Sequence, residues 1–227
     1  MDWLKIEVNP GGNYSFHIPP VARDLVSKVL GDNCPQMFQR DTSGRLLDTP
    51  PAVLYGGCGG TMHLHGIGLT GLETLQHHLF DILNGLRAET GSSPLVKISS
   101  GSFPDELHLS STLIRYRIPR LMVKTQRPAA RERWFGPHAK DHVEGKVRDL
   151  FLRRMKALDI TVPEDLVFGD VNYERSVPIA QDGVLRLALV NVTFRTNAQL
   201  PLLEGAPFHL GAKTSLGFGV VLPGGTA

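Results

Sequence analysis

The order of secondary-structure elements predicted for the first hundred residues constrains the fold more than any other feature of the chain. Residues 4–8 alternate apolar and polar side chains, as in a half-buried strand, and Pro19-Pro20 precede an amphipathic helix over residues 21–30 that Gly31 ends. Further strands are predicted at residues 52–55, 62–67 and 95–98, and a second helix at 72–86. The order strand–helix–strand–strand–helix–strand predicts a ferredoxin-like unit.

The second half of the chain repeats this order less regularly. A strand pattern covers residues 113–123, with Leu113, Arg115 and Arg117 on one face, and Pro119 within it indicates an edge strand or a break. A helix is predicted at 141–158, and strands at 166–173, 184–196 and 217–222. We therefore predict an α+β protein of two tandem ferredoxin-like (RRM-like) domains, residues 1–105 and 106–227, with a basic helical insertion in the second. The boundary falls within the Ser- and Gly-containing stretch 99–111.

Positive charge is concentrated in the middle of the chain. Residues 115–156 hold 13 Lys/Arg and 4 Asp/Glu, a local charge of +9, so the other residues must sum to −7 to give the net charge of +2. This asymmetry indicates a polyanion-binding face, although a solvated amphipathic helix is the alternative. Trp134 and Phe135 lie among these arginines, where aromatic side chains either stack on bases or anchor a loop.

Several classes of protein are disfavoured by what the sequence lacks. Two cysteines without a C-x-x-C pair are typical of a reduced, cytoplasmic protein and do not predict structural zinc. No signal peptide and no apolar run of membrane-spanning length is present, so no membrane association is expected. His63 and His65 share a strand face and could in principle bind a metal, but no third ligand is near in sequence, and a half-exposed strand face explains them better. We expect neither a metal nor a cofactor.

A glycine-rich loop at residues 211–219 is the strongest chemical motif. It places Gly211, Gly217 and Gly219 around Lys213. Glycines allow a ligand to approach the backbone closely, exposed N–H groups form an anion-binding concavity, and the lysine adds charge. The loop is neither a Walker loop nor a dinucleotide fingerprint, and taken alone it could be an ordinary tight turn.

This loop, Gly-Ala-Lys-Thr-Ser-Leu-Gly-Phe-Gly, resembles the C-terminal glycine-rich loop of the RAMP superfamily of CRISPR-associated proteins, and more narrowly of its repeat-RNA processing endoribonucleases. The stretches 118–127 and 196–200 are similar to the type IV members of that family. The resemblance covers residues 110–222 well and the N-terminal half in outline. It implies two ferredoxin-like domains, CRISPR repeat RNA as the bound stem-loop, and other effector-complex subunits as protein partners.

The resemblance also implies a metal-independent cleavage in which a ribose 2′-OH attacks the adjacent phosphate. Many family members use a histidine in or just after the first helix, but residues 32–51 contain none, and the nearest histidine is His17. The type IV pattern of arginines instead implies Arg23 and Arg40 as catalytic residues, with His17 as a further candidate. The candidate RNA-binding residues are Gly211, Lys213, Thr214, Ser215, Arg115, Arg117, Arg120, Lys124, Arg127, Arg131, Arg133 and Lys140.

Three functions compete at this point. The first is an endoribonuclease that cleaves precursor CRISPR RNA in the repeat stem-loop and stays bound to the mature guide. The second is a non-catalytic RAMP subunit that caps one end of the guide RNA. The third, a small-molecule phosphate enzyme, is disfavoured because acidic metal ligands do not cluster.

Overall fold

In the computed structural model of the chain, two compact units are present. Met1–Phe103 forms most of the first unit and Pro104–Leu203 most of the second, and short segments after residue 203 are divided between them. The structure describes residues 1–16, 21–31, 34–38, 51–123, 139–181, 184–202, 205–211 and 218–224. Within these residues, no helix combines the length and the apolar character that crossing a bilayer requires.

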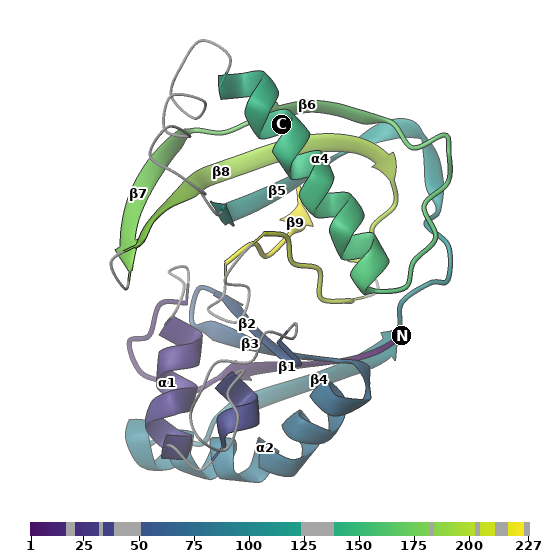
Figure 1. The fold of residues 1–227 in the computed structure, drawn as a ribbon. Helices are drawn as coiled ribbons and strands as arrows, with labels where there is room; N and C mark the ends of the chain where they lie inside the picture. The colour runs from purple at the N-terminus through teal and green to yellow at the C-terminus, as the bar shows by residue number, and fades with distance from the viewer. Residues whose placement is uncertain are drawn as a thin grey trace. The chain divides into compact units, whose positions relative to one another are not determined.

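The first unit is a ferredoxin-like domain. Its elements are β1 (Asp2–Asn9), α1 (Val21–Leu30), the short 3-10 helix η2 (Pro35–Phe38), β2 (Val53–Cys58), β3 (Thr61–Ile67), α2 (Gly68–Thr90) and β4 (Leu95–Ser102). The strands form an antiparallel sheet in the order β2-β3-β1-β4, which is the order that two interlocked βαβ units produce. Both helices lie on one side of this sheet (Figure 1).

Alternation along β1 explains why the helices cover only one face. Ile6 and Val8 are fully buried and belong to the same core as Val26 of α1 and Ile82 of α2. The predicted bounds of α1 are confirmed residue for residue, and Gly31 follows it with φ +62°, a conformation that ends helices and favours glycine. The first unit thus packs its apolar side chains against two helices and presents charged side chains on the other face.

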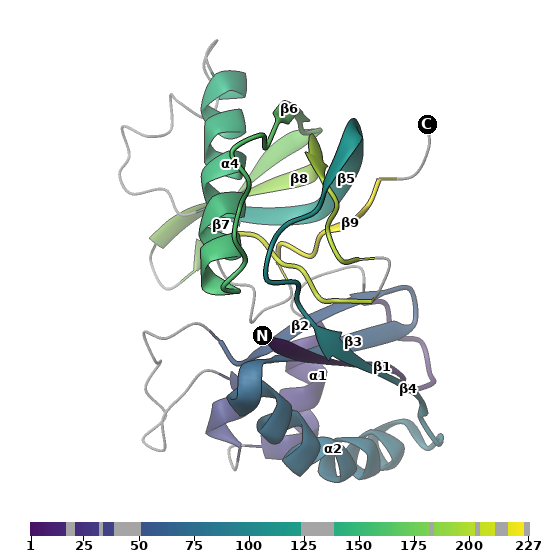
Figure 2. The ribbon, with the colours of Figure 1, turned by 90° about the vertical axis from the view of Figure 1, so that its right-hand side faces the viewer.

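The second unit repeats the strand order. It contains β5 (Leu109–Val123), α4 (Ala139–Ala157), β6 (Phe168–Asn172), β7 (Arg175–Gln181), β8 (Val184–Ala198) and β9 (Leu222–Pro223). The antiparallel order β6-β8-β5-β9 matches that of the first sheet, with α4 in the place of α1. Figure 2 shows α4 along one side of this sheet. The prediction of two ferredoxin-like domains is therefore confirmed, although residues 199–202, 205–211 and 218–221 form no second helix.

Three details of the second unit differ from the sequence prediction. β7 was not predicted. β6 and β7 pair one after the other with the same strand, β8. The interruption between them lies opposite Asn191, whose φ is +50°. The last strand was expected at residues 217–222 but is Leu222–Pro223, because Gly219 has φ +78° and Val220 forms only a single bridge to His209. β5 runs through Pro119 without a break, and its pairing with β9 is limited to Tyr116 and Arg117.

Candidate functional site

Arg23 is held in a fixed position at the start of α1. Its guanidinium carbon lies 5.2 Å from the centre of the Phe38 ring, and Phe38 in turn stacks on Tyr55 at 6.4 Å between ring centroids. The Tyr55 hydroxyl donates a hydrogen bond to the Met37 carbonyl at 2.9 Å, which fixes η2 against β2. A cation over an aromatic face is stabilised by the ring quadrupole, so Arg23 is positioned before any ligand binds.

Few charged groups near Arg23 in the described part of the chain neutralise its positive charge. Its only ion pair within the described part of the chain is with Asp24 at 3.9 Å, and Asp24 is mostly exposed. The Arg23 Nε atom is buried and has no hydrogen-bond partner there. Burial raises the pKa of Tyr55 far above its ordinary value although the charge of Arg23 opposes this, so Tyr55 remains a neutral hydroxyl. The Arg23 side chain is still 20% exposed, so an anionic ligand such as a phosphate can approach this cation.

The other two predicted catalytic residues, His17 and Arg40, lie outside the described residues, but the segments that lead to them are anchored. Phe16 precedes His17, is buried, and donates its backbone N–H to the Gly59 carbonyl at 2.8 Å. A Cβ on Gly57 would lie 2.3 Å from the Phe16 Cβ, so only glycine allows this contact. Phe38, two residues before Arg40, belongs to the same core as Phe16. The first unit therefore attaches both segments to the core that holds Arg23.

The base of the glycine-rich loop is closed by backbone hydrogen bonds. Leu210 donates its N–H to the Gly219 carbonyl at 2.8 Å, and Gly219 donates its own N–H to the Arg120 carbonyl at 2.7 Å. Gly211 has φ +91°, and a Cβ there would lie 2.7 Å from the Met122 carbonyl oxygen. These bonds join the loop to β5. Lys213, Thr214 and Ser215 lie outside the described residues.

The predicted RNA-binding arginines of β5 divide between its two faces. Arg115 and Arg117 are exposed on the face away from α4, whereas alternation places the half-buried Arg120 on the face of Tyr116 and Ile118. Of the remaining candidates, Lys140 is in the first turn of α4 without a described side chain. Lys124, Arg127, Arg131 and Arg133 lie outside the described residues.

Two arginines that the sequence analysis did not select stand out in the second unit. Arg154 of α4 has its Nε and Nη2 atoms buried without hydrogen-bond partners in the described part of the chain. Burial lowers the pKa of Arg154 to about 10, so it is still a cation at neutral pH. Arg195 of β8 is exposed and directly opposite Arg115. Periodicity identifies neither, because a cation at a helix face or a strand face is read as a solvated residue.

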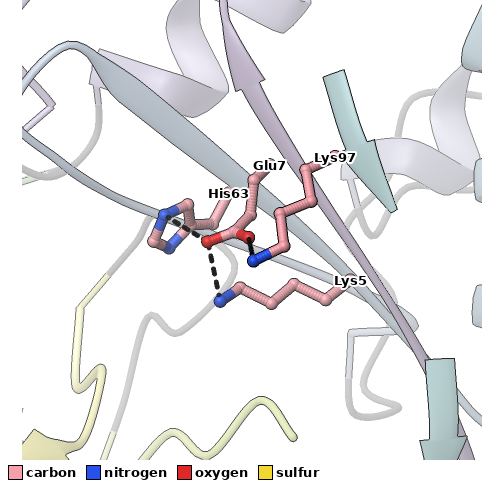
Figure 3. Close-up of polar contacts among 4 residues, drawn as sticks. All are labelled: Lys5, Glu7, His63 and Lys97. Carbon is pink, nitrogen blue, oxygen red and sulfur yellow. Dashed lines mark ion pairs between the residues drawn. The ribbon is translucent and has the colours of Figure 1, made fainter. Parts of the chain in front are cut away.

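A polar cluster occupies the helix-free face of the first sheet (Figure 3). Lys5 and Glu7 come from β1, His63 from β3 and Lys97 from β4. Glu7 is the centre: its carboxylate lies 3.0 Å from Lys5 Nζ, 3.5 Å from His63 Nε2 and 3.6 Å from Lys97 Nζ. Burial alone would raise the pKa of Glu7, but the hydrogen bond and charge of Lys5, with smaller effects of His63 and Lys97, lower it. Burial and Lys5 lower the pKa of His63 to about 4, against the opposing effect of Glu7.

The low pKa of His63 predicts an acid-sensitive fold. Since the unfolded chain would bind a proton at His63 near pH 6.5 and the folded chain only near pH 4, stability is lost as the pH falls between these values. We expect the urea-derived free energy of unfolding to fall more steeply over this interval in the wild type than in His63→Gln, by at most about 1.4 kcal/mol per pH unit. His77→Gln, on the exposed face of α2, is the control; a slope unchanged by His63→Gln would contradict the assignment.

Solved structures with the same fold identify the architecture. The chain superposes on "Csf5, CRISPR-Cas type IV Cas6 crRNA endonuclease" with a TM-score of 0.71 at 13% identity, covering 99% of this chain and 100% of that one. The fold is that of the Cas6 endonucleases. A structure of Cas6b gives a TM-score of 0.68 at 15% identity, and another, described as a CRISPR RNA processing endoribonuclease, gives 0.64 at 14%; each covers 99% of this chain and 100% of its own. No protein-family profile and no curated protein matches the chain.

The Cas6 fold confirms, at the level of architecture, the resemblance seen in the glycine-rich loop. It extends over the N-terminal half, which the sequence related to the family only in outline. Within the described residues, no group of three or more His, Cys, Asp or Glu side chains is placed to hold a metal ion. The described residues present cationic groups instead: the guanidinium of Arg23 on α1 and the exposed arginines of the second sheet. Such groups can bind and stabilise a polyanionic substrate.

Proposed function

We propose that this chain is a metal-independent endoribonuclease that cleaves precursor CRISPR RNA in the repeat stem-loop. The observation that carries the proposal is Arg23, whose guanidinium is held over Phe38 and whose side chain is partly exposed, in a chain with the Cas6 fold. The type IV protein that shares this fold is described as a crRNA endonuclease. The arginines of the present chain supply the positive charge that would stabilise the transition state of such a cleavage.

The proposed chemistry is an internal transesterification. The ribose 2′-oxygen attacks the adjacent phosphorus, the bond from phosphorus to the 5′-oxygen breaks, and the products are a 2′,3′-cyclic phosphate and a 5′-hydroxyl. Arg23 and Arg40 donate hydrogen bonds to the phosphorane oxygens as negative charge develops. Lys213 adds a cation from the glycine-rich loop, and His17 is the candidate for proton transfer.

Binding is assigned to the basic residues of the second unit. The arginines and lysines between residues 115 and 140 contact the phosphates of the stem, and the N–H groups of the glycine-rich loop contact one phosphate closely. A product held by so many phosphate contacts dissociates slowly, so the protein stays on the mature guide RNA and enters an effector complex with other CRISPR subunits.

Chelation provides the first test of the proposal. Cleavage of a labelled cognate repeat by purified protein should continue at an unchanged rate in excess EDTA and leave a 2′,3′-cyclic phosphate, because the reaction uses protein cations and not a bound metal. Loss of cleavage on chelation, restored by magnesium, would contradict this mechanism. Tight binding without cleavage under any condition would instead identify a non-catalytic RAMP subunit that caps the guide RNA.

A further inference from the structure

The outer strand of the first sheet has an open edge. In the order β2-β3-β1-β4, β4 is the last strand, and among the described residues it pairs with β1 alone. Where this pairing ends, Phe103 donates its N–H to the Met1 carbonyl at 2.8 Å. Because the direction of hydrogen bonding alternates along an antiparallel strand, the N–H and C=O groups of residues 96, 98, 100 and 102 point away from β1. β4 thus presents a row of backbone donors and acceptors at the edge of the sheet.

β4 also exposes apolar side chains on both of its faces. Register places Val96 and Ile98 beside Val8 and Ile6 of β1, on the face that the helices cover. Val8 and Ile6 are fully buried, whereas Val96 is 38% and Ile98 54% exposed, and Leu95 on the other face is 74% exposed. Three of the eight large apolar side chains that are exposed in the described ranges therefore come from one four-residue stretch. Exposed apolar side chains on an open edge mark a site of protein association.

The edge lacks the features that usually prevent strand pairing. Natural edge strands are protected by charged side chains, prolines, bulges or a covering element. Lys97 is the only charged residue of β4, and its Nζ lies 3.6 Å from a carboxylate oxygen of Glu7 in the same chain. Pro94 precedes the strand and is not within it, and the register with β1 runs through β4 without a bulge. A second strand can therefore add to this edge by main-chain hydrogen bonding.

The sequence of β4 is complementary to itself in the antiparallel direction. The three residues before Ile98 have large side chains, and the three after it are serine, serine and glycine. A second copy paired about a two-fold axis at Ile98 would therefore place every large side chain opposite a small residue. The opposed pairs would be Leu95 with Gly101, Val96 with Ser100, and Lys97 with Ser99. In this register no two lysines lie directly opposite each other, and the outward backbone groups of residues 96, 98 and 100 can exchange hydrogen bonds with the second copy.

We propose that β4 is a self-association surface, through which two copies of this chain join their four-stranded first sheets into one continuous antiparallel sheet. The match of large with small residues around Ile98 selects a second copy as the occupant, because the same strand supplies both halves of the match. A two-fold contact also pairs both open edges at once and leaves neither free to recruit further copies. Since the contact comes from one short strand, we expect a reversible dimer with a Kd of about 1–100 µM and not an obligate one.

Analytical ultracentrifugation over a range of protein concentrations tests the proposal. The wild type should shift from monomer to dimer as its concentration rises through the micromolar range. Ile98→Lys places two cations directly opposite each other on the axis and should raise the Kd of the dimer at least 10-fold. Val167→Lys makes a matched change in the second unit, where Val167 is 51% exposed, and should dimerise as the wild type does. Because Ile98 is more than half exposed, its replacement should leave the thermal midpoint and the cleavage of repeat RNA unchanged.

Disulfide trapping tests the register and does not depend on the lysine variant. In a Cys58→Ser background, which removes the exposed native thiol, Ile98→Cys should give an oxidised dimer, since the paired Cα atoms would be about 5.5 Å apart. Val96→Cys should stay monomeric under the same oxidation, because residue 96 would be about 14 Å from its counterpart. A wild type that is monomeric at every concentration, a dimer that Ile98→Lys leaves intact, or trapping through Val96→Cys in place of Ile98→Cys would overturn the proposal. None of these outcomes bears on cleavage, so the proposed function is tested separately.

Discussion

Replacement of Arg23 by alanine is expected to slow cleavage of bound repeat RNA by roughly 100-fold or more, because loss of one preorganised transition-state donor typically costs about 3 kcal/mol. The expectation follows from the position of the guanidinium, which is stacked over Phe38 while part of the side chain stays exposed. A group fixed in this way does not have to be reorganised when charge develops on the phosphorane. RNA binding should weaken far less, because the phosphate contacts proposed for the second unit remain.

Single-turnover cleavage at saturating protein, read beside filter binding, separates the two effects. Arg40→Ala should behave as Arg23→Ala does, and Lys213→Ala should show an intermediate loss, since the glycine-rich loop contributes backbone groups as well as charge. Lys28→Ala is a matched control on the same helix: Lys28 is a mostly exposed cation that pairs with Glu89, and its loss should leave the cleavage rate unchanged. Wild-type rates in both arginine variants, with His17→Ala inactive, would replace the arginine mechanism with a histidine mechanism.

Local sequence signals were sufficient to predict the bounds of an element where those bounds are determined by the element's own residues and its immediate neighbours. α1 was predicted residue for residue because its apolar stripe is bounded by two prolines and a glycine. The interruption between β6 and β7 could not be predicted, because it depends on Asn191 with φ +50° in β8, a strand that begins later in the chain. The last strand was misplaced for a related reason: Gly219 takes a positive φ to meet Leu210 and Arg120, and neither partner is a neighbour in sequence.

The candidate site divides in the same way, into residues that local sequence places and residues that only the fold brings together. The sequence placed Arg23 on the first helix and Arg115 and Arg117 on one strand face, both as the structure has them. It could not pair Arg115 with Arg195, because residues 80 positions apart are brought together only by strand register. Nor could it identify Arg154, since a cation beside Phe151 and Met155 on an amphipathic helix is expected to reach solvent, whereas two of its nitrogens are buried.

Replacement of Gly219 by alanine is expected to open the base of the glycine-rich loop. The backbone there has φ +78°, and a Cβ would lie 1.7 Å from the Leu210 carbonyl oxygen and 2.8 Å from its carbonyl carbon. Both are backbone atoms, so no change of rotamer relieves the contact. The left-handed conformation costs a side-chain-bearing residue about 1–2 kcal/mol, and each lost backbone hydrogen bond about 1 kcal/mol more. We therefore expect the free energy of unfolding to fall by about 3 kcal/mol.

The same change, glycine to alanine, is expected to have the opposite effect on stability at Gly145. Gly145 lies within α4, and a Cβ there would meet nothing within 4 Å, so alanine should stabilise the protein by about 0.5–1 kcal/mol. Urea unfolding of the two variants should move in opposite directions. Repeat RNA binding should weaken only in Gly219→Ala, because the proposed contact of the loop with one phosphate depends on a closed loop base. If Gly219→Ala kept both wild-type stability and wild-type RNA affinity, closure of the loop through Leu210 and Arg120 would have no part in binding, and Lys213 would act without this support.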